Sequence, residues 1–405
     1  MRNNLLVYTE NYQRGGGNKY AISVINNLAT VTNEIIFVAN KSGLFPEEKD
    51  FLANNVILKE IRMMSSSALN QYSNQYKYRG IIFKVLFRIA NFLLKPLFLI
   101  YQMLLFFIIL LRTRPKQIII FNGGYPGARS CQVLAVIARF FTRDISMSIV
   151  SMPIEYKKIT KFFAYYLDVL VWKSCKFVVT NCTSIAEALT LQRALPTSKD
   201  KRVLLNGVDD IDNYSQYKKK INESNETIIG YVGRIEESKG VMVIVDAFKM
   251  ISGIHPQARL HIYGDGHEMD LLKKKIDSFG IEKLVKVFGH YNEPVSEIFK
   301  LMDIYTLPSY REGLSYSLLE AMRSGVAIIA TDVGGTKEAI NHLENGIIVP
   351  TKSVESMYRG LTLLIKNSEL RKRLGIEARR VFLNKFESSN FQINSINVFL
   401  GIYQK

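Results

Sequence analysis

The chain of 405 residues is poor in cysteine and proline, with three of the former and ten of the latter. Three cysteines are too few to cross-link a chain of this length by disulfide bonds, which excludes a disulfide scaffold and favours a reducing compartment. A content of 25 glycines and 48% hydrophobic residues excludes a collagen-like rod and wholesale disorder. No signal-peptide pattern precedes the first strand-like run, so we expect a cytoplasmic protein. The length of the chain favours two domains.

Acidic residues are absent between Glu60 and Asp144, although twelve lysines and arginines lie in this stretch. The whole chain carries a net charge of +17, and residues 1–210 account for +14 of it. A basic chain favours nucleic acid, a membrane surface or anionic substrates as partners. Because most of the charge lies in one part of the chain, we expect that part to make the contact with the anionic partner.

The basic segment 77–111 is apolar apart from its cations. Four of the cations recur at helical spacing, namely Lys77, Lys84, Arg88 and Lys95. They predict one polar stripe on an otherwise apolar helix that ends near Pro96. Residues 97–111 predict a second apolar piece, which at about 22 Å is too short to span a ~30 Å hydrocarbon layer. We expect the segment to attach the protein peripherally to an anionic membrane, on the inner face of the cell membrane. The alternative is a buried helix pair that packs on a sheet.

Short β-branched runs alternate with longer helical stretches along the chain. In the first half the predicted strands are Leu5–Tyr8, Glu34–Ala39, Val56–Lys59, Gln117–Phe121, Ile145–Val150, Lys176–Thr180 and Arg202–Leu205. In the second half they are Thr227–Tyr231, Arg259–Tyr263, Val285–Phe288, Asp303–Leu307, Val326–Thr331 and Ile347–Val349. This alternation predicts two doubly wound α/β domains with parallel sheets, whose ligands bind at the carboxyl ends of the strands. A polar linker over residues 211–226 follows the predicted boundary.

A glycine-rich turn, Gly15-Gly16-Gly17, follows the first predicted strand and precedes a helical pattern over residues 19–28. Such a turn lets backbone amides approach a phosphate at a helix N-terminus. The alternative is an ordinary flexible turn.

The second half opens on Gly230-Tyr-Val-Gly233-Arg234 and then Lys239-Gly240. These two cations flank the turn after a strand, where a diphosphate can sit between an arginine fork and a lysine point charge. The alternative is a pair of solvated surface cations. Further glycines close two later strands and suit either a bound ligand or an ordinary turn, at Gly264, Gly266 and in Phe288-Gly289-His290.

The densest constellation of polar residues extends from Pro308 to Gly325. Glu312 lies in the loop after a strand, where it can hold a sugar, and the amides of Leu314, Ser315 and Tyr316 can receive a phosphate. Glu320 lies inside a predicted helix among apolar residues, a setting that an unpaired carboxylate avoids. Glu320 is therefore either a ligand for ribose hydroxyls or the partner of Ser317 in a capping box. Gly325 suits the end of the helix, and Ser315 or Ser317 its start.

Glu312 and Glu320 are spaced as in the E-x7-E motif of retaining GT-B-fold glycosyltransferases of family 4, and the chain resembles that family. Further pieces follow in family order: Asn206–Asp209, Gly233-Arg234 with Lys239-Gly240, Gly264–Gly266, Pro308-Ser309 and Asp332–Glu338. The resemblance implies two Rossmann-like domains whose parallel sheets face each other across a cleft. Residues 1–208 would bind the acceptor and the membrane, and residues 209–387 would bind the donor. A helix over about 388–405 would pack back on the first domain.

The resemblance also implies roles for single residues. Arg234 and Lys239 would neutralise the diphosphate leaving group, while Glu312 would hold hydroxyls of the donor sugar. Glu320 would bind the ribose. The remaining donor-binding residues would be Gly15, Gly16, Gly233, Gly264, Gly266, His290, Leu314, Ser315 and Tyr316. No metal ion or cofactor is implied, because the cations stabilise the leaving group, and the co-substrate is expected to be a UDP-sugar rather than a GDP-sugar.

One departure from the family concerns histidine. Many members place a histidine beside the donor sugar after the strand that matches Ile145–Val150, whereas all five histidines of this chain lie in its second half. Ser151 and Glu155 occupy the matching stretch and are the candidate substitutes.

The expected function is transfer of a sugar from a nucleotide-diphosphate donor to a lipid-linked or membrane-borne acceptor, in capsule, exopolysaccharide or O-antigen synthesis. The alternatives are another GT-B enzyme, such as a phosphorylase or a nucleotide-sugar epimerase, and a non-enzymatic protein that binds nucleic acid or membrane. Nucleic acid is disfavoured, because the cations align on a helix otherwise covered by isoleucine, leucine and phenylalanine.

Overall fold

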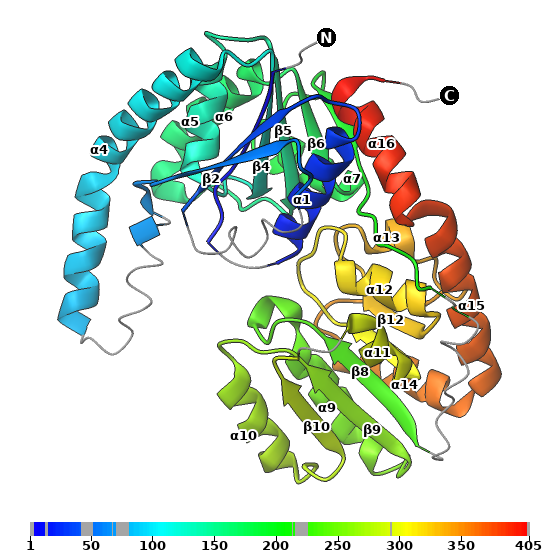
Figure 1. Ribbon diagram of the computed structural model, residues 1–405. Helices are drawn as coiled ribbons and strands as arrows, with labels where there is room; N and C mark the ends of the chain where they lie inside the picture. Colours follow the sequence, from blue (N-terminus) through cyan, green and yellow to red (C-terminus); the bar gives the residue numbers. More distant parts are fainter. Residues whose placement is uncertain are drawn as a thin grey trace. The chain divides into compact units, whose positions relative to one another are not determined.

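The computed structural model describes residues 4–12, 15–41, 52–66, 68–69, 81–212, 214, 226–291 and 294–402. The chain divides into two compact units (Figure 1). The N-terminal unit contains Met1–Leu204 and Gln392–Lys405, and the C-terminal unit contains Leu205–Phe391. The observed divisions lie four residues from those expected at 208 and 388.

The N-terminal unit is built on a parallel sheet of seven strands in the order β3-β2-β1-β4-β5-β6-β7. The strands are β1 (Leu5–Thr9), β2 (Ile35–Asn40), β3 (Val56–Ile61), β4 (Gln117–Gly124), β5 (Asp144–Ser151), β6 (Phe177–Thr180) and β7 (Asp200–Val203). The central strands are buried on both faces, as near-continuous runs such as Leu5–Thr9 require. Reversal of the strand order at β1 and β4 makes this a doubly wound sheet, as predicted.

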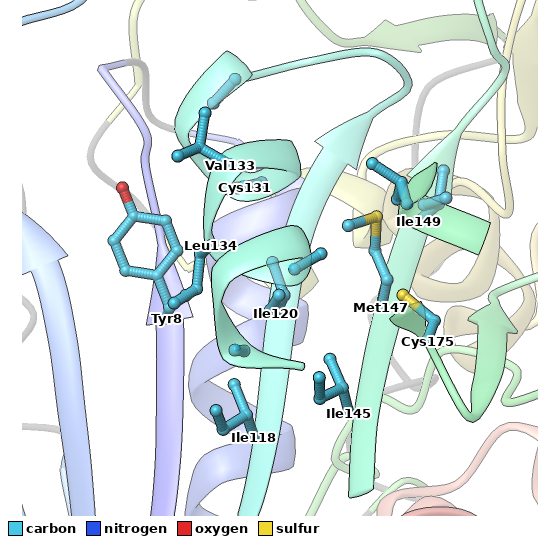
Figure 2. Packing of buried hydrophobic residues seen from close by; sticks show 14 of the residues in the cluster. Tyr8, Ile118, Ile120, Cys131, Val133, Leu134, Ile145, Met147, Ile149 and Cys175 are labelled. Atoms are coloured by element: carbon cyan, nitrogen blue, oxygen red, sulfur yellow. The ribbon is translucent and has the colours of Figure 1, made fainter. Parts of the chain in front are cut away.

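Helices cover both faces of this sheet. They are α1 (Gly16–Ala29), α4 (Ile81–Thr113), α5 (Arg129–Ala138), α6 (Lys161–Ser174) and α7 (Thr183–Gln192), with a 3-10 turn η2 (Lys158–Thr160). Figure 2 shows alternate residues of β4 and β5, such as Ile120 and Met147, packed beside α5, which contributes Leu134. Residues of α4, α6 and α7 belong to the same core cluster, so these helices share one face of the sheet with α5.

The opposite face of the sheet carries α1 and the end of the last helix, α16 (Ser388–Leu400). Asn27 of α1 donates a hydrogen bond to Ser395 Oγ of α16 at 3.2 Å. The Phe399 ring contacts Phe121 of β4, with ring centroids 6.2 Å apart. The C-terminal segment from residue 392 is therefore part of the N-terminal unit.

The prediction that Pro96 divides the basic segment into two helical pieces is wrong, because α4 runs through Pro96 as one helix of 33 residues. Proline removes one backbone donor and bends a helix, but it does not end a helix whose face is held by packing. That face is a row at a spacing of four, formed by Phe98, Gln102, Phe106 and Leu110, and all four are buried. Lys77 lies outside the described residues, as do the side chains of Lys84 and Arg88.

The C-terminal unit contains a second parallel sheet, with six strands in the order β10-β9-β8-β11-β12-β13. These are β8 (Thr227–Val232), β9 (Ala258–Tyr263), β10 (Val285–Gly289), β11 (Ile304–Leu307), β12 (Ala327–Thr331) and β13 (Ile347–Val349). All predicted strands of the second half are present, with ends within about one residue. This unit is doubly wound too, with its reversal at β8 and β11.

The helices of this unit are α9 (Val241–Ser252), α10 (Met269–Phe279), α11 (Val295–Lys300), α12 (Tyr316–Ser324), α13 (Thr336–Ala339), α14 (Val354–Lys366) and α15 (Ser368–Lys385), with a 3-10 turn η3 (Glu237–Lys239). Two separate core clusters lie on the two faces of the sheet. Ile329 of β12 belongs to one and its neighbour Ile328 to the other, because successive side chains of a strand point to opposite faces.

Candidate active site

Glu312 lies at the carboxyl end of β11, in the loop that leads into α12. Its Oε1 accepts a hydrogen bond from Lys239 Nζ at 2.5 Å and another from Ser309 Oγ at 2.9 Å. The side chains of the ion pair are 18% exposed for Lys239 and 13% for Glu312. Two residues 73 positions apart in the sequence thus meet in a nearly buried, charge-assisted contact at the edge of the sheet where ligands bind.

Lys239 is held in place by a close approach of two backbone segments. Gly240 follows the turn η3 in the left-handed conformation, at φ +65°. A Cβ at this position would lie 2.2 Å from the carbonyl oxygen of Pro308, so only glycine allows the two segments to touch. The backbone N–H of Tyr310 also donates to Ser238 O at 2.8 Å. The β8 turn and the β11 loop are therefore joined beside the Lys239–Glu312 pair.

Arg234 lies near the start of the same turn and is more exposed than Lys239. Its guanidinium pairs with Glu236 at 3.0 Å, and 55% of its side chain is exposed. The Tyr231 hydroxyl donates to the Arg234 carbonyl oxygen at 2.7 Å, which fixes the backbone beneath the arginine. The two predicted phosphate-binding cations thus lie in one turn after β8, and each faces a carboxylate in this structure.

Glu320 lies in the second turn of α12 and is only 8% exposed. The helix begins at Tyr316 with Ser315 as its N-cap residue, and it ends at Gly325 with φ +66°. The alternative of a capping box with Ser317 is wrong, because Ser317 lies inside the helix. Its hydroxyl instead accepts a hydrogen bond from Tyr305 at 2.7 Å.

The two glutamates of the E-x7-E pair both raise the pKa of one buried tyrosine, Tyr305. Burial raises the pKa of Tyr305 well above its usual value, and the charges of Glu312 and Glu320 raise it further. Burial also raises the pKa of Tyr291, with a smaller contribution from Glu320. Both carboxylates therefore contribute to the electrostatic surroundings of Tyr305 in β11.

The loop before α12 is held by two hydrogen bonds from elsewhere in the unit, which the carbonyl oxygens of Gly313 and Leu314 accept. Asn206 Nδ2 donates to the carbonyl oxygen of Leu314 at 2.6 Å, and Gly335 N donates to Gly313 O at 2.9 Å. Asn206 belongs to the predicted boundary motif, and Gly335 to the Asp332–Glu338 motif. These contacts place three motifs of the sequence around one loop.

The predicted glycines after β8 and β9 serve first to pack two turns together. Gly264 has φ +136°, and a Cβ there would lie 1.8 Å from the carbonyl oxygen of Gly233. A Cβ on Gly266 would lie 2.1 Å from Ile235 O. His290 follows β10 and is exposed, next to a stack of Tyr263 on Phe288 with ring centroids 4.1 Å apart.

The remaining predicted residues belong to the N-terminal unit. Gly15 is the N-cap of α1, which begins at Gly16, and both glycines are exposed at the carboxyl end of β1. Ser151 ends β5 and Glu155 lies in the segment after it, both exposed. Within the N-terminal unit, the predicted residues of this half thus follow the carboxyl ends of β1 and β5.

Two site residues escaped the sequence argument. Ser309, which is fully buried, was noted only as part of a motif, yet it binds Glu312. Tyr305 lies in the short, fully buried strand β11, where the sequence alone indicates a core residue. The one sequence signal for Ser309 was its position three residues before Glu312, a spacing at which a hydroxyl and a carboxylate can meet within one tight loop.

The comparisons with known proteins agree with this geometry. Residues 213–381 match the family model of glycosyl transferases group 1. The solved structure of Anabaena Alr3699/HepE in complex with UDP superposes with a TM-score of 0.72 over 98% of this chain and 100% of its own, at 15% identity. The fold is therefore the GT-B fold, and its C-terminal unit contains a glycosyltransferase group 1 domain.

Two sequence relatives carry the same class of name. An uncharacterized glycosyltransferase of Haemophilus influenzae is 32% identical over 205 residues, which cover 50% of this chain and 57% of that protein. The capsular polysaccharide biosynthesis glycosyltransferase CapM of Staphylococcus aureus is 28% identical over 299 residues, which cover 69% of this chain and 76% of CapM. The chain thus spans little more than half the length of the Haemophilus relative.

Proposed function

We propose that the protein is a retaining glycosyltransferase that moves a sugar from a UDP-sugar to a lipid-linked or otherwise membrane-borne acceptor. The observation that carries this proposal is the Lys239–Glu312 pair at the carboxyl end of β11, with Arg234 in the adjoining turn. In the proposed site, Lys239 contacts the carboxylate that would bind the sugar, so its charge would lie near the bond between sugar and phosphate.

Each residue has a defined task in the proposed reaction. The bond between the anomeric carbon and the diphosphate oxygen breaks, and the acceptor oxygen bonds to the same face of that carbon. Lys239 and Arg234 stabilise the negative charge that develops on the departing diphosphate, and the acceptor proton moves to that diphosphate. Glu312 orients sugar hydroxyls, and Glu320 accepts hydrogen bonds from the ribose. No metal ion enters the proposal, because the two cations provide the charge that the leaving group needs.

The choice of donor and pathway is supported by relatives. Alr3699/HepE has been solved with UDP and with UDP-glucose, which supports a UDP-sugar as the donor. CapM is named for capsular polysaccharide biosynthesis, which supports a role in the synthesis of a surface polysaccharide. We extend both properties to this chain as part of the proposal.

Helix α4 supports a peripheral site on the inner face of the cell membrane. Its stretch Ile89–Thr113 is long and apolar enough to cross a membrane by length and composition alone, and 22% of the most apolar window is buried. The row from Phe98 to Leu110 instead packs into the N-terminal core, while Leu93, Leu97 and Leu104 on the outer side are 59–67% exposed. A helix docked along one side and apolar on the other suits the plane of a membrane interface.

The proposed reaction is tested by transfer assays on three variants, Glu312→Ala, Arg234→Ala and Lys239→Ala. We expect each to lose at least about tenfold in turnover, because each removes a charged contact to the donor. Nuclear magnetic resonance of the product reports the anomeric configuration, which should match that of the donor. Near wild-type turnover in all three variants would refute the proposed site, and an inverted product would refute retention. A free, altered nucleotide sugar without glycosylated product would indicate an epimerase instead.

Attachment through α4 is tested separately with vesicles. The double substitution Lys84→Glu with Arg88→Glu should release the protein from anionic vesicles, because it reverses two charges of the basic segment. Unchanged vesicle binding would refute the role of the predicted stripe.

A further inference from the structure

Helix α6 exposes a cluster of aromatic side chains that the glycosyltransferase site does not use. Phe162 is 65% exposed and Phe163 is 78% exposed, with Tyr165 and Tyr166 at 45% and 54%. The rings contact one another, with centroids 4.7 Å apart for Phe162 and Tyr166. Four large aromatic rings in the first two turns of one helix form an exposed apolar patch, which is typical of an interaction site and not of a face that contacts only water.

The base beneath this aromatic cluster is rigid. Asp168 of α6 is fully buried and pairs with Arg193, whose Nε lies 2.9 Å from Asp168 Oδ2. Tyr125 and Tyr156 donate hydrogen bonds to the same carboxylate at 2.8 and 2.7 Å. A buried ion pair with two further donors fixes the orientation of α6, so its aromatic face is a stable surface.

The charge around the cluster is positive. Lys157, Lys158 and Lys161 precede the phenylalanines, and Lys173 follows near the end of the helix; all four are exposed. Residues 156–167 contain no acidic residue; the exposed Glu155 precedes them, and Asp168, which follows, is buried in its pair with Arg193. Aromatic rings flanked by lysines match the interface of an anionic bilayer, where rings lie at the headgroup level and lysines meet lipid phosphates.

The cluster belongs to the same helical layer as α4. Both helices pack against α5, and all three contribute to one core on one face of the N-terminal sheet (Figure 1). The chain reaches α6 from the end of β5 at Ser151, so the aromatic turns lie toward the carboxyl ends of the strands. These are the ends at which parallel sheets bind their ligands.

We propose that α6 is a second membrane-contacting element, whose aromatic first turns enter the interface of an anionic bilayer beside the acceptor end of the N-terminal unit. The proposal rests on the proposed function, since it presumes a membrane-borne acceptor. Contact through both α4 and α6 would fix the rotation of the domain on the membrane. The headgroup of an acceptor lipid could then reach the carboxyl ends of the strands while its chains stay in the bilayer.

The test is flotation of the full chain with vesicles of phosphatidylglycerol and phosphatidylcholine. The variant Phe162→Ser with Phe163→Ser should bind roughly tenfold or more weakly, because two large side chains lose their burial in lipid. The matched control is Ile254→Ser with Leu271→Ser, which alters two residues of the C-terminal unit that are 59% and 56% exposed. The control should bind as wild type. Equal binding of the aromatic variant and the control would overturn the proposal.

A second measurement reports insertion directly and does not depend on loss of binding. The chain has one tryptophan, Trp172, which is 1% exposed and gives a constant background. In the variant Phe163→Trp, the emission of the new side chain should shift to the blue with vesicles and be quenched by brominated lipids. The proposal would be overturned if vesicles left the emission of the new tryptophan unchanged. It would also be overturned if the wild-type protein were a dimer that did not bind vesicles and the Phe162→Ser, Phe163→Ser variant were a monomer, because α6 would then be a dimer interface.

UDP binding by thermal shift separates this inference from the proposed function. The aromatic variant should keep the wild-type response to UDP, because its substitutions lie outside the donor site. Loss of lipid binding with an intact UDP response supports the α6 proposal. Absence of a UDP response in the wild-type protein would refute the proposed donor, whatever the vesicles show.

Discussion

Replacement of Lys239 by methionine tests the donor site most sharply, since it removes one charge and keeps the length of the side chain. Lys239 Nζ lies 2.5 Å from Glu312 Oε1, in a pair that is less than one-fifth exposed on either side. A hydrogen bond to a charged group in such a setting contributes about 1.5–3 kcal/mol. If Lys239 makes the same contact to the donor diphosphate, its loss should weaken UDP binding by roughly 10–150-fold.

Calorimetric titration with UDP measures this change. The converse variant, Glu312→Gln, should bind UDP at least as tightly as wild type, because the lysine is no longer shared with a carboxylate, yet its sugar transfer should fall. A matched control is Lys275→Met, which breaks the 2.6 Å pair with Asp246 between α10 and α9. That control should leave the affinity for UDP unchanged. Wild-type affinity in the Lys239 variant would refute the assignment of this lysine to the diphosphate.

Three further predictions concern stability. Gly240→Ala should cost at least about 2 kcal/mol in urea denaturation, whereas Gly280→Ala, also at positive φ but in open space, should cost about 1 kcal/mol; equal costs would refute the close contact between the two loops. Asp168→Asn should cost about 3–5 kcal/mol because it leaves a buried arginine without its counter-charge, while Asp144→Asn breaks an exposed pair and should cost less than about 1 kcal/mol. Burial, assisted by the charge of Lys286, lowers the pKa of His261. As the pH falls, the unfolded state therefore binds a proton at this histidine before the folded state does, so the His261 contribution to stability should be complete above about pH 6.5 and should be lost below it. The substitution His261→Phe should reduce this dependence of the melting temperature on pH in thermal denaturation.

The alternation of elements could be predicted from the sequence because both sheets are parallel and buried on both faces. Strands such as Leu5–Thr9 and Ala327–Thr331 are short, continuous apolar runs bounded by polar residues, a local signal that tertiary packing reinforces. The break predicted at Pro96 failed for the opposite reason. The local rule for proline was overridden by a row of side chains that pack at a spacing of four on the N-terminal core.

The candidate site could be predicted only as a set of motifs. Spacing identified Glu312 and the cations of the β8 turn, but it did not indicate that Lys239 reaches Glu312 across 73 residues. That contact depends on Gly240 and Pro308 touching at the edge of the sheet, a consequence of strand order. The aromatic face of α6 was missed since its sequence resembles that of a core helix, and only its exposure distinguishes it.

Transfer of radiolabelled sugar from UDP-sugars to a lipid-extractable acceptor tests the central claim most directly. Purified protein is incubated with UDP-glucose, UDP-galactose or UDP-N-acetylglucosamine and with bacterial membranes as the source of acceptor. We predict label in the lipid extract with at least one donor, and its loss in the variants Glu312→Gln and Lys239→Met. Label that stays in the aqueous phase with all three donors, or transfer that both variants retain, would contradict the account.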